Sequence, residues 1–184
     1  MTTHNVRKPF VFVAGGRLAL KNIPTALRAF DLLAKKKDQI QLVVSGASGV
    51  PEIETLAAQL PSRARTRLVP HLEESDLVAA YSGAEIFVFP SLQASFGFPP
   101  LEAMACGTPV IASGVDAIPE VVKDAAYLVD CKQPEPLAQA MIEVLEDPTL
   151  RANLIKRGSE RVKQFRWERA AEQTLGVYEE AMRS

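Results

Sequence analysis

The chain has 184 residues, of which 47% are hydrophobic and 23% are charged, and its formal net charge at pH 7 is −1. This balance is typical of one globular domain, here expected to span residues 1–184, and it excludes disordered and uniformly basic nucleic-acid-binding chains. No run of about 18 apolar residues occurs, so we expect a cytoplasmic protein without direct membrane insertion. The net charge of −1 gives no overall basic field, so we expect no nucleic-acid partner. Cys106 and Cys131 are far apart and have no CxxC pair or histidine cluster beside them, so we expect no zinc site.

Short apolar runs alternate with helical patterns from one end of the chain to the other. The apolar runs predict strands at 10–14, 40–44, 67–69, 86–89, 109–112 and 126–129. The amphipathic stretches between and after them predict helices at 23–36, 52–60, 73–81, 99–106 and 135–146. From Pro148 to Arg183 the pattern is helical, with a break near 165–167.

This alternation of strands and helices predicts the α/β class. Strands that are apolar throughout and separated by helices are typical of a parallel sheet with both faces covered. We therefore expect a Rossmann-like, doubly wound parallel sheet of about six strands, with helices on both faces and a helical C-terminal tail. In such a fold, ligands bind in a crevice at the carboxyl ends of the strands.

The first predicted strand leads into a loop with two glycines and two cations, Gly15, Gly16, Arg17 and Lys21. Glycine lets the backbone approach an anion, Arg17 can donate to two phosphate oxygens, and the next helix adds its dipole. A tight turn with solvated cations explains the same residues equally well. The loop has neither GxGxxG nor Walker spacing, so neither a dinucleotide site nor a P-loop is indicated.

A second loop, at 90–98, follows the strand predicted at 86–89 and leads into a helix. The backbone N–H groups of Gly97 and Phe98 should be free at the start of this helix, since the prolines that follow have no N–H. Glu102 lies about one turn further on, where a carboxylate can accept hydrogen bonds from two ribose hydroxyls. The alternative is a solvated glutamate that only complements the helix dipole.

These segments resemble the donor-binding domain of retaining glycosyltransferases with the GT-B fold, of the glycosyl transferases group 1 or family 4 type. The resemblance covers nearly the whole chain. It rests on GGRLALKN at 15–22, PSLQASFGFPPLEAMACGTPVIAS at 90–113, AIPEVV at 117–122 and FRWE at 165–168. It implies a transferase whose substrate is a nucleotide sugar, a UDP or GDP sugar, and which uses no cofactor and no metal.

The resemblance also implies roles for individual residues. Arg17 and Lys21 would neutralise the donor diphosphate and stabilise the leaving group, so they are the expected catalytic residues. Glu102 would hold the ribose, and the base would lie beside the loop after the third strand. The full set of expected donor-binding residues is Gly16, Arg17, Lys21, Val69, His71, Ser95, Phe96, Gly97, Phe98 and Glu102.

Two features depart from the family pattern. The family usually has a glutamate eight positions before Glu102, where this chain has Ala94, whose methyl group cannot bond to a sugar hydroxyl. In addition, Arg17 and Lys21 are separated by three residues, where four is common in relatives. Ala94 removes an expected contact with the donor sugar, whereas binding of the diphosphate depends less on that position.

Proteins of this architecture have two Rossmann-like domains, and this chain resembles only the C-terminal one. The resemblance therefore implies a missing N-terminal acceptor domain as partner, and an isolated chain that is inactive or nearly so. The last helix would cross back to that domain, and without it Leu175, Tyr178 and Met182 must pack on this domain or stay exposed. The main alternative is a non-catalytic nucleotide-binding or interaction module derived from the family. A flavodoxin-like regulatory domain is disfavoured, because no acidic phosphoacceptor site follows the first strands.

Overall fold

The computed structural model, which describes residues 6–16 and 19–183, contains a six-stranded parallel sheet. The strands are β1 (Phe10–Ala14), β2 (Gln41–Ser45), β3 (Thr66–Val69), β4 (Ile86–Phe89), β5 (Val110–Ser113) and β6 (Tyr127–Val129). Their order is β3-β2-β1-β4-β5-β6, and every neighbouring pair is parallel. The predicted doubly wound sheet is confirmed, and each strand begins and ends within one residue of its predicted position.

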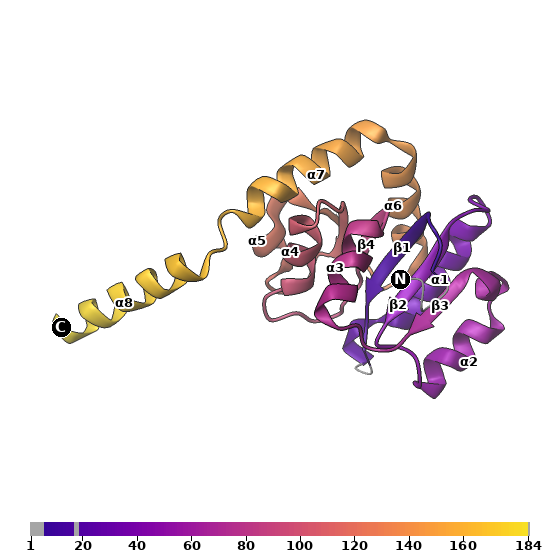
Figure 1. The fold of residues 1–184 in the computed structure, drawn as a ribbon, viewed down its shortest axis with the longest axis horizontal. Coiled ribbons are helices and arrows are strands. Elements are labelled where there is room, and N and C mark those ends of the chain that lie inside the picture. The colour runs from indigo at the N-terminus through magenta and orange to yellow at the C-terminus, as the bar shows by residue number, and fades with distance from the viewer. Residues whose placement is uncertain (1–5, 17–18, 184) are drawn as a thin grey trace.

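Helices join the strands and continue beyond the last one (Figure 1). The α-helices are α1 (Ile23–Ala34), α2 (Pro51–Gln59), α3 (Glu74–Gly83), α4 (Phe98–Ala105), α5 (Ile118–Val122), α6 (Pro134–Glu146), α7 (Pro148–Val162) and α8 (Trp167–Arg183). Short 3₁₀ helices are η2 (Ala19–Lys21), η3 (Pro61–Arg65) and η4 (Lys123–Ala125). The expected helices and the break before α8 are confirmed. Three details were wrong, because α1 ends two residues before the predicted position 36, α3 ends two residues after the predicted position 81, and α5 was not predicted at all.

The two faces of the sheet bury separate hydrophobic cores. Along β1, Val11 and Val13 face one core while Phe10 and Phe12 face the other, because side chains alternate along a strand. Helices α1, α2 and α6 cover the first face, and α3, α4 and α5 cover the second. Since α1 follows β1 and α4 follows β4, these two adjacent strands send their helices to opposite faces of the sheet.

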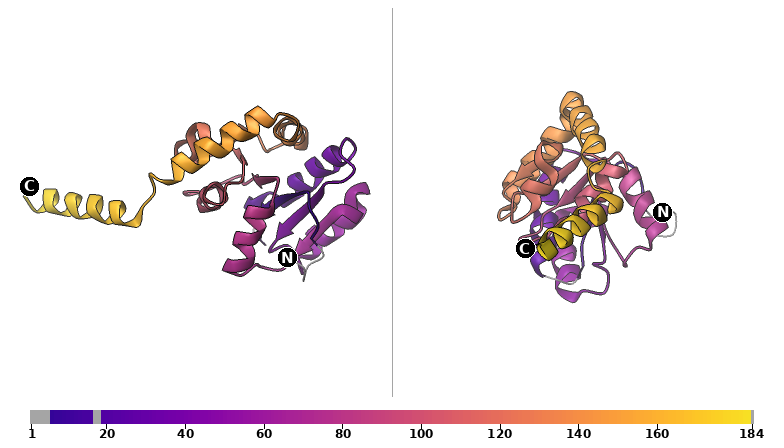
Figure 2. Two further views of the ribbon diagram at one scale, coloured as in Figure 1. Left: turned by 45° about the horizontal axis from the view of Figure 1, so that its top comes forward. Right: turned by 90° about the vertical axis from the view of Figure 1, so that its left-hand side faces the viewer.

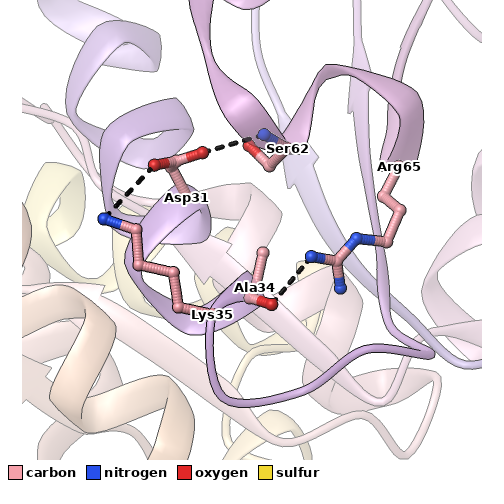
Figure 3. Close-up of polar contacts among 5 residues, drawn as sticks. All are labelled: Asp31, Ala34, Lys35, Ser62 and Arg65. Atoms are coloured by element: carbon pink, nitrogen blue, oxygen red, sulfur yellow. Dashed lines mark hydrogen bonds and ion pairs between the residues drawn. The ribbon is translucent and has the colours of Figure 1, made fainter.

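A polar link joins the end of α1 to η3, the short helix that leads into the edge strand β3 (Figure 3). The buried Asp31 carboxylate accepts a hydrogen bond of 2.9 Å from the backbone N–H of Ser62. The Arg65 guanidinium donates to the carbonyl oxygens of Ala34 at 2.7 Å and Lys37 at 2.6 Å. The last carbonyls of a helix have no partner within it, so Arg65 satisfies groups that would otherwise need water.

Helix α8 projects away from the sheet and its covering helices (Figure 1 and Figure 2). Its apolar side chains are therefore exposed, with exposed fractions of 60% for Leu175, 61% for Tyr178 and 80% for Met182. The sequence left two outcomes open for these side chains, packing on this domain or exposure, and the structure shows exposure. Within residues 6–16 and 19–183, no helix has the length and apolar character needed to cross a membrane.

Candidate functional site

Two loops lie next to each other at the carboxyl ends of β1 and β4. Strands β1 and β4 are direct neighbours in the sheet, so the described residues 15–16 and 19–22 after β1 adjoin the segment 90–97 after β4. The helices that follow the two strands cover opposite faces, so the loops diverge at this point. Such a switch point is where doubly wound sheets hold their ligands.

Asn22 connects three of the segments that border this switch point. Its side-chain amide is buried and donates hydrogen bonds to the carbonyl oxygens of Pro90, at 3.1 Å, and Cys131, at 2.7 Å. Asn22 has a φ of 53°, in the left-handed region that asparagine tolerates better than most residues. The amide therefore fixes the loop after β1 to the loops after β4 and β6. Sequence analysis missed Asn22; an asparagine directly before a helix was the available signal.

Each glycine of the first loop meets a local constraint, close packing at Gly15 and backbone conformation at Gly16. The Gly15 N–H donates to the Ser45 carbonyl oxygen at 3.0 Å, and a Cβ added at Gly15 would lie 2.9 Å from that same oxygen. Gly16 has a φ of 144°, which a residue with a side chain rarely adopts. The tight-turn interpretation therefore accounts for both glycines, whether or not an anion binds. The predicted cation Arg17 lies outside the described residues.

Lys21 ends η2 and reaches the carboxyl end of β4. Its ammonium nitrogen lies 5.6 Å from the centroid of the Phe89 ring, a distance at which a cation is attracted to the face of an aromatic ring. Within residues 6–16 and 19–183, no carboxylate forms an ion pair with Lys21. Its positive charge is therefore available to an anion at this edge of the sheet.

The second loop ends in a glycine that no other residue can replace without strain. Gly97 has a φ of 106°, and a Cβ at this position would lie 2.5 Å from Cδ1 of Ile118. The chain then enters α4 at Phe98, and prolines follow at 99 and 100. Within the described part of the chain, the N–H groups of Gly97 and Phe98 have no hydrogen-bond acceptor. Two backbone donors at a helix N-terminus therefore have no protein acceptor among the described residues, an arrangement that favours an anion.

The remaining residues of this loop differ in exposure. Ser95 and Phe98 are exposed, while Phe96 is half-buried. At position 94, the backbone N–H donates to the carboxylate of Asp116 at 2.9 Å. Asp116, which sequence analysis did not single out, thus brings a negative charge to the position where the family usually has a glutamate.

Glu102 is held in place by a tyrosine of the neighbouring helix α3. The Tyr81 hydroxyl donates to Oε2 of Glu102 at 2.8 Å. Burial, and then the adjacent Glu102 charge, raise the pKa of Tyr81 well above its usual range, so the phenol stays protonated and remains a donor. Oε1 of Glu102 has no hydrogen-bond partner within the described residues, and the side chain is exposed. This carboxylate is therefore oriented and still able to accept a ligand hydroxyl.

Val69 and His71 lie at the same edge of the sheet but farther from the two loops. Strand β3 is separated from β4 by β2 and β1, which corresponds to roughly 14 Å at the usual strand spacing. The carbonyl oxygen of Val69 accepts from Ser48, and His71 is exposed. No hydrogen bond or ion pair between described residues joins His71 to either loop. Among those same residues, no three potential metal ligands gather.

Comparison with known proteins gives consistent matches. Residues 2–161 match the model of the family described as glycosyl transferases group 1. The chain is 34% identical over 161 residues to the O-antigen chain mannosyltransferase B of Escherichia coli, covering 86% of this chain and 42% of that protein. It is also 34% identical over 185 aligned residues to the D-inositol 3-phosphate glycosyltransferase of Saccharomonospora viridis, covering 94% of this chain and 43% of that protein. The chain thus spans less than half the length of these curated relatives.

Solved structures show the same fold. The sucrose-phosphate synthase of Thermosynechococcus elongatus superposes with a TM-score of 0.84 at 31% identity, covering 98% of this chain and 48% of that one. The C-terminal domain of a glycosyl transferase group 1 family protein from Francisella tularensis superposes with a TM-score of 0.72 at 25% identity. That match covers 85% of each chain.

Proposed function

This chain belongs to the glycosyl transferases group 1 family, and from that premise we propose that it binds the nucleoside diphosphate of a sugar donor at the loops after β1 and β4. The proposal rests on one observation: two features that can bind an anion lie at the same switch point. Lys21 has no carboxylate partner within the described residues, and the Gly97 and Phe98 N–H groups have no acceptor there. Asn22 holds the two loops together, so both features can act on one diphosphate.

The chemistry of the proposed transfer follows from the charge that develops on the donor. When the bond between the anomeric carbon and the phosphate oxygen breaks, negative charge builds up on the departing nucleoside diphosphate. Lys21 and the N-terminus of α4 would stabilise that charge, because fixed charges and dipoles need no reorganisation during the reaction. We propose the same role for Arg17 and a ribose contact for Glu102. Transfer with retention, without a metal or cofactor, is part of the proposal.

We further propose that this chain is the donor half of a larger enzyme. The relatives it matches are longer, since the chain covers 42% and 43% of the two curated proteins described above. An acceptor must be held beside the donor for efficient transfer, because positioning supplies a large part of the rate enhancement. We therefore propose that a second, N-terminal domain binds the acceptor, and that this chain alone transfers sugar poorly.

The diphosphate site is tested by calorimetry of this chain with UDP, GDP and inorganic pyrophosphate. Lys21→Ala should weaken binding of all the ligands by about tenfold or more, because one charge-assisted contact is lost. Lys156→Ala removes the same charge from an exposed position on α7 and should change nothing. Equal affinity of wild type and Lys21→Ala would remove the diphosphate from this loop.

The ribose contact is tested separately with Glu102→Gln, which keeps an oxygen to accept from Tyr81. This variant should weaken binding of UDP or GDP by roughly threefold to tenfold, because a neutral amide oxygen replaces the charged acceptor of the hydrogen bond, and it should not weaken binding of pyrophosphate. A parallel loss of both ligands would show that Glu102 does not contact the ribose.

A non-catalytic nucleotide-binding module is the second candidate, and position 94 favours it. Ala94 offers no group for a sugar hydroxyl, and its N–H is taken by Asp116. Nucleoside-diphosphate titration does not separate the two candidates, because both bind. Turnover of a nucleotide sugar by the complete two-domain protein does, since the non-catalytic module would bind the donor without consuming it.

A further inference from the structure

A second binding region lies where α7 ends and α8 begins. An apolar groove of about 460 Å³ runs between α4 and this junction, and its walls include Leu101, Ala105 and Val162. Aromatic rings close it further. Phe96 and Phe165 meet edge to face at 5.8 Å, and the exposed Trp167 stacks on Phe98 at 6.4 Å between ring centroids.

A cationic notch of about 340 Å³ adjoins this groove. Three arginines, Arg161, Arg166 and Arg169, line the notch together with Gln164 and Gln173, and among the described residues no carboxylate lines it. Arg161 is fixed, because it donates to the carbonyl oxygens at 120 and 121 and lies 4.7 Å from the Phe165 ring centroid. Arg166 and Arg169 form no ion pair within the described residues. Two guanidinium groups are therefore available to an anion.

The groove and the notch are continuous, because Phe96, Phe165, Arg166 and Ala170 line both. A molecule that fills both would place an apolar chain against the rings and an anionic end among the arginines. Guanidinium groups bind both phosphate and carboxylate with paired hydrogen bonds. A phosphate monoester carries a charge of about −1.5 to −2 at pH 7, which matches two free guanidinium groups better than the single charge of a carboxylate does. A free phosphate would leave the apolar groove uncovered, and a neutral apolar molecule would leave the arginines without a counter-charge.

We propose that this junction binds a lipid phosphate, an amphiphile that joins a phosphate ester to an alkyl or isoprenoid chain. The groove borders the proposed donor site, because Phe98 and Glu102 belong to both. The arginine notch contains neither Lys21 nor Gly97, so the proposal does not depend on nucleoside-diphosphate binding. The groove extends to Glu102, so a bound chain would lie beside the residue proposed to hold the donor ribose.

Trp167 is the only tryptophan of the chain and reports on this site directly. It is 79% exposed, so a bound alkyl chain should shift its fluorescence emission to shorter wavelength. The probes are dodecyl phosphate below its critical micelle concentration, dodecyl maltoside as an uncharged amphiphile with the same chain, and glycerol 3-phosphate as a phosphate ester without the chain. Dodecyl phosphate should bind saturably and at least about tenfold more tightly than either of the others, because each lacks one of the two contacts.

Paired variants separate the notch from general charge attraction. Arg166→Ala with Arg169→Ala should raise the Kd of dodecyl phosphate by about tenfold or more and leave that of dodecyl maltoside unchanged. Lys156→Ala with Lys163→Ala removes the same charge from neighbouring positions that do not line the notch, and should have no effect. These side chains are all exposed, and circular dichroism melting curves establish that each variant is folded.

Two further variants test the groove and the independence of the site. Ala105→Phe fills the groove and should weaken both dodecyl ligands, whereas Leu175→Ser, on the part of α8 beyond the groove, should weaken neither. Lys21→Ala should weaken nucleoside-diphosphate binding by about tenfold or more and leave dodecyl phosphate binding unchanged, so either proposal can fail alone. The lipid phosphate site is overturned by the absence of a saturable shift with dodecyl phosphate, by an affinity for dodecyl phosphate no higher than that for either other probe, or by equal losses in the two paired variants.

Discussion

Asn22→Ala should destabilise the fold and weaken nucleoside-diphosphate binding together, although Asn22 is not proposed to touch the ligand. The substitution removes the hydrogen bonds to the Pro90 and Cys131 carbonyl oxygens. Two buried hydrogen bonds contribute about 1–3 kcal/mol in all. The left-handed φ of 53° adds about 1–2 kcal/mol when alanine replaces asparagine. The expected loss in free energy of unfolding is therefore about 2–5 kcal/mol.

The loss is measured by urea unfolding at pH 7, and binding is measured by calorimetry with UDP or GDP. Asn22→Gly removes the same hydrogen bonds but tolerates the left-handed backbone, so it should be destabilised less than Asn22→Ala. Asn153→Ala, an exposed asparagine on α7, serves as the matched control and should change stability by less than about 0.5 kcal/mol.

Asn22 is expected to affect both the stability of the fold and the affinity for nucleoside diphosphate. If Asn22→Ala is no less stable than Asn153→Ala, the amide makes no net contribution and other contacts hold the loops. If stability falls but affinity, measured well below the unfolding midpoint, is unchanged, the alignment of the two loops is not what forms the diphosphate site.

Three further changes have defined outcomes. Gly97→Ala should lower the free energy of unfolding by about 2–4 kcal/mol, because it combines an unfavourable φ with a clash against Ile118. Gly107→Ala should lose only the part that comes from the unfavourable φ, because a Cβ there has open space around it. Burial raises the pKa of the Cys131 thiol to about 12. The stabilisation by this neutral thiol is therefore complete below the ordinary thiol pKa near 9 and is lost as the pH rises from 9 towards 12. Unfolding curves at pH 8 and 10 should show this loss, and Cys131→Ala should reduce it. Ala94→Glu should tighten a nucleotide sugar by roughly 0.5–1.5 kcal/mol relative to its nucleoside diphosphate, as calorimetry with both ligands would measure.

Each of these has an outcome that would contradict it. Equal destabilisation by the two glycine substitutions would mean that Ile118 moves aside at little cost. A pH dependence unchanged by Cys131→Ala would assign the alkaline loss to other groups, such as Tyr81, whose pKa is also raised by burial. An unchanged preference in Ala94→Glu would indicate that the Asp116 carboxylate repels the new one or that the sugar lies elsewhere.

Much of the fold was predictable because it depends on local patterns. The run Ile86–Phe89 is apolar at every position and buried at every position, as a strand covered on both faces must be. The alternation of such runs with helical periodicity predicts the parallel sheet, and prolines near helix starts help to place their first turns. The end of α1 was misplaced, and the structure shows Arg65, from another element, bound to the carbonyl of Ala34 there.

The sequence by itself determined the order of the elements, the parallel sheet and the two loops at its carboxyl edge, because periodicity and turn residues act between neighbours in the chain. Only the tertiary structure decided that Asn22 joins these loops, since its partners Pro90 and Cys131 are 68 and 109 residues away. It alone also placed Ile118 against Gly97 and gathered the arginines of the α7–α8 junction beside an apolar groove. Contacts between distant segments depend on how helices pack on the sheet, and no local pattern encodes that packing.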